Sequence, residues 1–156
     1  MSNSLYPVFL KLEKLSLLII GGGKIALEKL ESVLGNSPET SIRLVAREII
    51  PEVRSLQDQF ANITLHERPY DDDDFNDTDL AIIAVNDIVL AEQIRNDAHQ
   101  KNVLVNIADK PDLCDFYLGS IVRKGSLKIA ISTNGKSPTI AKRLRAVSYT
   151  HLTLPT

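Results

Sequence analysis

The sequence predicts an α/β fold in which a parallel sheet carries helices on both faces. Short apolar runs recur along most of the chain, as expected for strands that are buried on both sides. Amphipathic segments with helical spacing separate these runs. Because parallel neighbours in a sheet are joined by right-handed crossovers, this alternation is typical of a doubly wound sheet.

The first strand is expected at 15–20, where an almost continuous apolar run ends at three glycines. The next helix has its apolar residues at helical spacing, and Gly35 is placed to end it. Pro51 suits the first turn of a second helix, and Asn86 or Asp87 suits the cap of a third. The other strands of the sheet are expected at 42–45, 63–66, 80–85 and 103–106.

Beyond the sheet, the pattern changes to two strand-like runs, 116–122 and 127–132, with Gly125 in the short link between them. This pattern predicts a β-hairpin, and hairpins in that position often pair across a dimer axis. A helix begins after Ser137 and carries several basic residues, among them Lys142. The chain therefore ends in a small hairpin, expected to serve dimerisation, and the start of a helical region.

These patterns divide the chain into a sheet domain at 1–112, a hairpin with a basic helix at 113–146, and a tail at 147–156. The tail contains no Lys, Arg, Asp or Glu, and its last nine residues continue neither the helical pattern nor the charge pattern. We expect the tail to be foreign to the gene, from cloning or from a sequencing or assembly error. An ordinary disordered end is the alternative.

Composition excludes several classes of protein. The formal net charge of -2 gives no general attraction to nucleic acid or to anionic membranes, so we expect neither as a partner. A single cysteine, Cys114, excludes an internal disulfide, and a small structural thiol is the favoured interpretation of it. The chain shows no signal peptide and no apolar run long enough to span a bilayer, which predicts a cytoplasmic protein.

One biased segment, the aspartate run at 71–74, allows two interpretations. A divalent cation site would need interleaved ligands and a glycine turn, and neither is present in this run. A solvated loop with acidic residues before the strand at 80–85 is favoured, and no metal site is expected. His99, late in the third helix, is expected at the surface, where a cation suits the helix dipole.

The glycine turn after the first strand has the pattern of a dinucleotide site. Pyrophosphate binding needs a tight turn, a second glycine for close backbone approach and a small residue where helix meets strand. Gly21, Gly23 and Ala26 occupy these three positions, and the N–H groups from Gly22 onward would face the phosphates. Since the turn follows a buried strand and opens an amphipathic helix, a Rossmann-type site is favoured over a plain glycine turn.

The residues after the second strand leave the choice of dinucleotide open. An NAD site usually has an acidic residue here, which accepts a hydrogen bond from the ribose. Glu48 could take that role, whereas Arg47 could stack on adenine or meet the 2′-phosphate of NADP. This segment alone does not separate the two cofactors.

Four motifs in this order and spacing resemble the NAD-dependent precorrin-2 dehydrogenase module of sirohaem synthases. They are YPVFL at 6–10, GGGKIALEK at 21–29, NIADKP at 106–111 and STNGKSP at 132–138. The resemblance runs from about residue 5 to 146. It implies a Rossmann fold and the oxidation of precorrin-2 to sirohydrochlorin with NAD; some family members also insert ferrous iron.

The resemblance also implies roles for individual residues. Asp109 takes the catalytic position. Without the resemblance, a role as a turn residue beside Pro111 would fit Asp109 equally well. Thr133 falls where some relatives have a serine near the tetrapyrrole. Because the substrate carries many carboxylates, a helix start and nearby cations are expected to bind it, namely Ser137, Lys136 and Lys142. The implied cofactor contacts are Gly21, Gly22, Gly23, Lys24, Ile25, Ala26, Arg47, Glu48 and, by position alone, Val85 and Asn86.

The family continues past the basic helix into a further helical region that closes over the substrate. We therefore expect this chain to bind NAD and form a homodimer with part of the precorrin-2 pocket cut short. The competing hypothesis is a nucleotide-sensing Rossmann module without catalysis, which needs the glycine turn but makes no demand on Asp109.

Overall fold

The computed structural model describes residues 2–152, which fall into two compact units. The sheet unit is Phe9–Phe116, and the hairpin unit combines the described parts of Met1–Val8 and Tyr117–Thr156. Within residues 2–152, no helix is both long enough and apolar enough to cross a membrane.

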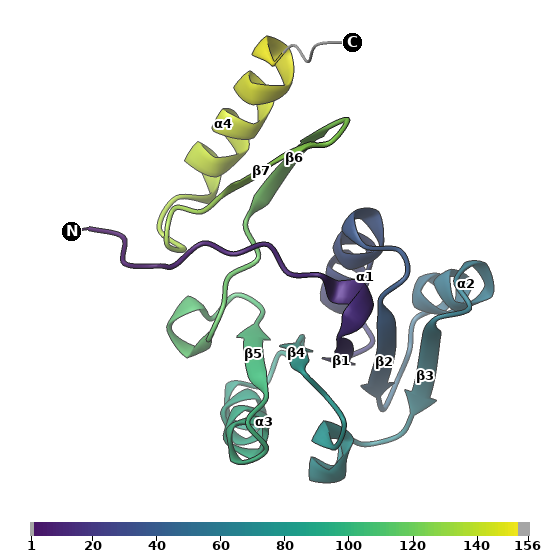
Figure 1. Cartoon of the computed structure of the whole chain (residues 1–156). Helices are drawn as coiled ribbons and strands as arrows, with labels where there is room; N and C mark the ends of the chain where they lie inside the picture. Colours follow the sequence, from purple (N-terminus) through teal and green to yellow (C-terminus); the bar gives the residue numbers. More distant parts are fainter. Residues whose placement is uncertain (1, 153–156) are drawn as a thin grey trace. The chain divides into compact units, whose positions relative to one another are not determined.

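The sheet unit contains five parallel strands in the order β3-β2-β1-β4-β5, which confirms the predicted doubly wound fold (Figure 1). Its strands are β1 (Ser16–Ile20), β2 (Ser41–Ala46), β3 (Ile63–Glu67), β4 (Leu80–Ile83) and β5 (Leu104–Ile107). Its helices are α1 (Lys24–Asn36), α2 (Pro51–Gln59) and α3 (Ile88–Gln100), with short 3-10 turns η1 (Leu12–Lys14), η2 (Asp72–Phe75) and η3 (Pro111–Leu113).

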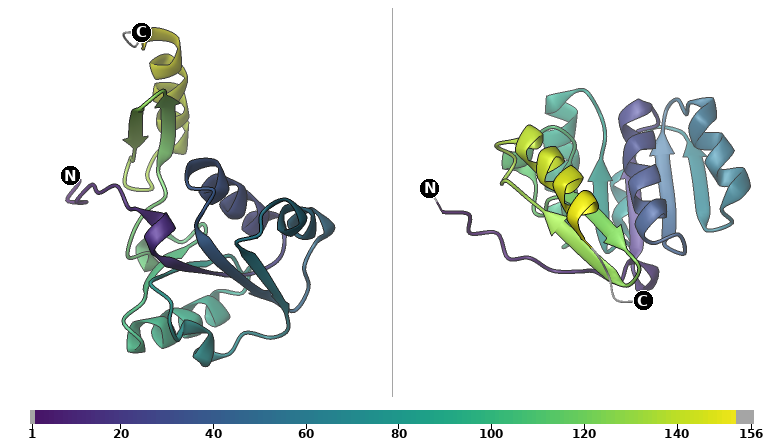
Figure 2. Two further views of the ribbon diagram at one scale, coloured as in Figure 1. Left: turned by 45° about the vertical axis from the view of Figure 1, so that its right-hand side comes forward. Right: turned by 90° about the horizontal axis from the view of Figure 1, so that it is seen from above.

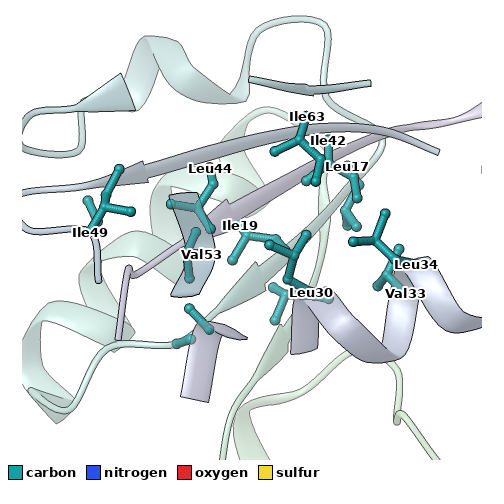
Figure 3. Packing of buried hydrophobic residues seen from close by; sticks show 14 of the residues in the cluster. Leu17, Ile19, Leu30, Val33, Leu34, Ile42, Leu44, Ile49, Val53 and Ile63 are labelled. Atoms are coloured by element: carbon teal, nitrogen blue, oxygen red, sulfur yellow. The ribbon is translucent and has the colours of Figure 1, made fainter. Parts of the chain in front are cut away.

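Two apolar layers enclose the sheet, because successive residues of a strand point to opposite faces. Leu17 and Ile19 of β1 pack against α1, where they meet Leu30 and its neighbours (Figure 3). Leu18 and Ile20 belong to the other layer, which α3 covers. Burying each such side chain contributes roughly 1.5–3 kcal/mol, so the layers hold the strand ends in place.

Strand order determines where a ligand can bind. The chain leaves β1 toward β2 on one side and reaches β4 on the other side, so the connections diverge between β1 and β4. In open α/β sheets, this divergence opens a crevice beyond the carboxyl ends of the strands. The glycine turn follows β1 at that point.

Some predicted boundaries are wrong. Gly35 lies inside α1, which ends at Asn36, because the Ser37 N–H closes the last turn on the Val33 carbonyl. The strand predicted at 80–85 ends at Ile83, and the last strand of the sheet reaches Ile107. These differences amount to one or two residues at element ends, where flanking loops decide the hydrogen bonding.

The aspartate run is not solvated throughout, and the expectation is wrong at Asp74. That residue is 4% exposed and accepts a hydrogen bond from Arg68 at 2.9 Å. Burial acts to raise the pKa of Asp74, but the hydrogen bonds from Arg68 and the Asp71 N–H, with the charges of Arg68 and Arg43, together lower it below its ordinary value. Asp71 caps η2 by accepting a hydrogen bond from the Asp73 N–H at 2.9 Å. The run is therefore a capped turn closed by an ion pair.

The hairpin unit consists of β6 (Ser120–Lys124), β7 (Leu127–Ile131) and α4 (Pro138–His151), which lies alongside the hairpin (Figure 2). Gly125 adopts φ +58° in the two-residue turn, as its predicted role requires. The first strand of the hairpin, β6, begins at Ser120 and not at 116. Phe116 still belongs to the sheet unit, where its carbonyl accepts a hydrogen bond from the Asn106 side chain of β5.

Helix α4 continues through His151, so the expectation that the tail abandons the helical pattern is wrong for 148–151. Tyr149 explains the continuation: its hydroxyl accepts a hydrogen bond from the Arg123 N–H at 3.2 Å, and the Arg145 guanidinium lies 5.4 Å from its ring centre. These contacts hold the last turn of α4 against β6. The part of the tail at 153–156 lies outside the described residues.

Candidate functional site

The glycine turn is shaped by two close approaches of neighbouring backbone. Gly21 has φ +127°, and a Cβ atom there would lie 2.3 Å from the Ala84 carbonyl oxygen at the end of β4. A Cβ atom on Gly22 would lie 2.2 Å from the Glu48 carbonyl oxygen, because the loop after β2 packs on the turn. Around Gly23, by contrast, no heavy atom of the described structure lies within 4 Å of such a Cβ atom. The turn is closed on the protein side and open at Gly23.

Helix α1 begins at this opening. Gly23 is its N-cap and has no side chain to bond the first-turn N–H groups; the first intrahelical bond runs from the Leu27 N–H to the Gly23 carbonyl at 3.0 Å. The N–H groups of the first turn of a helix have no intrahelical partner and carry its positive dipole end. This cradle fits a pyrophosphate.

A cavity of about 510 Å³ lies over the turn, between the ends of β1, β2 and β4. It gathers most of the cofactor residues expected from the sequence: Gly21, Gly22, Gly23, Lys24, Ile25, Arg47, Glu48, Val85 and Asn86. Ala26 is the exception, because it lies fully buried on the core-facing side of α1, where its small side chain lets the helix approach the sheet. The cavity therefore has the glycine turn and Glu48 among its lining residues.

Sequence reasoning missed the apolar wall of this cavity, formed by Tyr70, Leu90 and Ile94. Tyr70 donates a hydrogen bond from its hydroxyl to Asp97 at 2.9 Å, and its ring meets the Phe75 ring edge-on with centroids 5.7 Å apart. Burial, with the hydrogen bond to Asp97, raises the pKa of Tyr70 far above its ordinary value, so the wall stays neutral. The position of Tyr70 just after the third strand was the sequence signal that could have identified it as a cavity residue.

Asp109 lies after β5, the strand beside β4, and outside the set of residues that line the cavity. It is exposed and adopts φ +62°, a left-handed conformation that is uncommon for residues other than glycine. The Ala108 N–H donates to the Ile83 carbonyl at 3.0 Å, and the Lys110 N–H donates to the Ile107 carbonyl at 3.2 Å. Asp109 therefore projects from a tight turn at the carboxyl edge of the sheet.

The segment after this turn returns to β5. Burial raises the pKa of the Cys114 thiol, which lies beside the Ile107 N–H and carbonyl groups. His99 Nε2 is 2.7 Å from Asp115 Oδ2, so the side chain expected at the surface is paired with the returning segment. The thiol has the structural surroundings that the sequence favoured.

Three expected substrate residues form one turn of the hairpin unit. The Lys136 N–H donates to the Thr133 carbonyl at 3.1 Å, and the Ser137 N–H donates to the Thr133 hydroxyl at 3.0 Å. Ser137 caps α4 by accepting from the Ile140 N–H at 3.4 Å. Lys142 is exposed on the next turn of α4. The turn and the helix start thus bring together the expected carboxylate-binding groups.

Comparison with known proteins agrees with this geometry. Residues 8–120 match the family model described as putative NAD(P)-binding. The chain belongs to this NAD(P)-binding family. Residues 124–146 also match the model described as the central region of sirohaem biosynthesis proteins. The glycine cradle and the family match together support NAD as the dinucleotide of the cavity.

Relatives of this NAD(P)-binding chain include two siroheme synthases. The one from Psychrobacter cryohalolentis is 37% identical over 141 residues, which are 90% of this chain and 26% of that protein. The one from Pseudoalteromonas atlantica is 34% identical over 140 residues, which are 90% of this chain and 30% of that protein. The chain thus spans less than a third of these relatives. The solved structure of SirC, precorrin-2 dehydrogenase, matches with a TM-score of 0.78 and 25% identity, covering 95% of this chain and 72% of that one.

Proposed function

We propose that this chain oxidises precorrin-2 to sirohydrochlorin with NAD, the dehydrogenase step of sirohaem biosynthesis, in the cytoplasm. The observation that carries the proposal is the cavity over the glycine turn, where the connections diverge between β1 and β4. The chain that forms it is similar to siroheme synthases over nearly its whole length. Removing two hydrogens from the macrocycle releases a hydride and a proton. When bound, NAD accepts the hydride, and a base of the protein takes the proton.

In this mechanism some residues of the chain bind and orient NAD, and one residue accepts the proton. The first-turn N–H groups of α1 bind the pyrophosphate, and Glu48 accepts a hydrogen bond from the adenosine ribose. Arg47 contacts the adenine side. Asp109, at the carboxyl edge of β5, accepts the proton as the hydride leaves. An exposed carboxylate on a fixed turn is suited to this role.

The hairpin unit binds the carboxylates of the substrate and forms the interface of a homodimer. Thr133, Lys136, Ser137 and Lys142 supply donors and positive charge. Apolar side chains one turn apart on α4, Ile140 and Leu144, are 53% and 47% exposed, which favours a covered surface. Sedimentation of the wild type and of Leu144→Glu tests the dimer: the wild type is expected to be a dimer and the variant a monomer. A monomeric wild type would contradict the proposed homodimer.

The experiment that tests the proposed reaction follows NADH absorbance with precorrin-2 under anaerobic conditions. Asp109→Asn is expected to lower kcat by about 10²–10⁴-fold while the Kd for NAD stays unchanged. Asp112→Asn, an exposed carboxylate in the next turn, is the matched control and should keep full activity. If the wild-type chain binds NAD but never oxidises precorrin-2, the nucleotide-sensing alternative is preferred.

A further inference from the structure

The loop that carries Asp109 is held by a thiol. Cys114 Sγ lies 3.1 Å from the Ile107 nitrogen, 3.2 Å from the Ile107 carbonyl oxygen and 3.3 Å from the Lys110 carbonyl oxygen. The sulfur accepts from the Ile107 N–H, and its own proton can be donated to either carbonyl. One side chain therefore joins a residue before Asp109 to the residue after it.

The next residue fixes the position of this thiol. Asp115 Oδ2 accepts a hydrogen bond from the Val105 N–H at 2.9 Å and lies 2.7 Å from His99 Nε2 of α3. The Asp115 N–H donates to the Val105 carbonyl at 2.8 Å. The backbone beside Cys114 is thus anchored to β5 and to α3, so the sulfur has little freedom to leave the loop.

The conformation of Asp109 needs such support. Aspartate is one of the residue types that tolerate the left-handed region, but this conformation still costs free energy at Asp109, so contacts across the turn favour it. The backbone supplies one bond across the turn, from the Lys110 N–H to the Ile107 carbonyl at 3.2 Å. The thiol contacts the same two residues and so adds a second link across the turn that carries Asp109.

We propose that Cys114 is a positioning residue for Asp109, acting through the thiol bridge between Ile107 and Lys110. The geometric part stands by itself, whereas its effect on turnover rests on the proposed function. Cys114 lies outside the residues that line the dinucleotide cavity. Its loss therefore affects the proton-accepting step and leaves NAD binding intact.

Three variants separate this role from simple filling of space. Cys114→Val keeps an apolar side chain of similar size and removes the hydrogen bonds, and Cys114→Ala removes both. Cys114→Ser restores a donor and an acceptor on a shorter side chain. A merely structural thiol predicts that Val resembles the wild type, whereas the bridge predicts that Ser does.

The first readout is amide hydrogen exchange by NMR in the whole chain. Exchange at Ile107 and Lys110 is expected to be about tenfold faster in Cys114→Val and Cys114→Ala, with Cys114→Ser near the wild type, because local opening controls exchange. Amides in α2, which packs on β3 at the opposite edge of the sheet, serve as the internal control. Equal exchange in Cys114→Val and wild type would overturn the proposal.

The second readout is turnover with precorrin-2. The kcat is expected to fall about 10- to 100-fold in Cys114→Val, since small displacements of a reacting group are costly, while the Kd for NAD stays within about twofold. An unchanged kcat in a variant with fast loop exchange would overturn the catalytic consequence. If the wild type shows no turnover but the exchange pattern is as expected, the bridge stands and the proposed reaction falls.

Discussion

Tyr70 is held from two sides, and this makes it more than a filler of the cavity wall. Asp97 fixes its hydroxyl, and Phe75 supports the edge of its ring. Aromatic rings with a fixed orientation present a flat apolar face, which suits a purine. We therefore expect Tyr70 to contribute to the affinity for NAD on the adenine side of the cavity.

Replacement of Tyr70 tests this contribution. Tyr70→Ala is expected to weaken NAD binding about tenfold, because the stacking face is lost, whereas Tyr70→Phe keeps the ring and should lose about threefold or less. Isothermal titration calorimetry measures both. Tyr6→Ala, at a tyrosine that is 88% exposed, is the matched control and should bind like the wild type. Equal NAD affinities for Tyr70→Ala and Tyr6→Ala would contradict a contribution of the Tyr70 ring to NAD binding.

At the scale of elements, two glycines of the strand–turn–helix unit have different roles, one in folding and one in ligand binding. Gly21 is enclosed by the end of β4, so its lack of a side chain serves the fold. Gly23 faces open space and lines the cavity, so its lack of a side chain serves the ligand. The same residue type therefore has two distinct roles within three positions.

Alanine at each glycine distinguishes the two roles. Gly23→Ala is expected to change the free energy of unfolding by less than about 0.5 kcal/mol but to weaken NAD binding at least about tenfold, because a methyl group occupies the phosphate approach. Gly21→Ala should lose several kcal/mol of stability, since the methyl group meets the Ala84 carbonyl at a left-handed position. Urea unfolding and NAD titration check the pair. Normal NAD affinity in Gly23→Ala would place the phosphates elsewhere.

The sequence was most informative where one periodic pattern determines an element. Buried strands such as 15–20 and the glycine turn were predictable, because their apolar runs and spacing are local properties. The burial of Asp74 was not, because it depends on the pairing with Arg68 in the same loop and on the contact with Arg43 of β2. The wall at Tyr70 depends on Asp97, which comes from α3. The bridge at Cys114 depends on the chain turning back onto Ile107, and no periodic pattern predicts such a turn.

At the scale of the whole molecule, one ion pair links the loop after β3 to acid stability. The carboxylate of Asp74 is bound by Arg68, and its carbonyl accepts from Arg43 of β2 at 2.8 Å. Because the folded-state pKa of Asp74 is lowered, its contribution is fully present above the ordinary value of 3.8. That contribution is lost as the pH falls through the lower folded-state value.

Asp74→Asn is expected to lower the free energy of unfolding by about 1–3 kcal/mol at neutral pH, because Arg68 loses its charged partner. The difference from the wild type should begin to shrink as the pH falls below 3.8, where the unfolded wild-type chain takes up the proton first. It should shrink further as the folded carboxylate, with its lowered pKa, is protonated as well. Urea unfolding across this pH range measures it, with the exposed Asp72→Asn as control. A difference that stays constant with pH would contradict the role of the ion pair.

The segment after η3, which contains Cys114 and Asp115, also covers the edge of the sheet at β5 and so hinders aggregation with other copies of the chain. Strand β5 is the last strand of the sheet, and its outward N–H groups at Val105 and Ile107 are occupied by the side chains of Asp115 and Cys114. Unpaired groups on an edge strand invite intermolecular strand addition and aggregation. Two side chains thus blunt an edge that would otherwise recruit another strand, and we expect their loss to lower solubility.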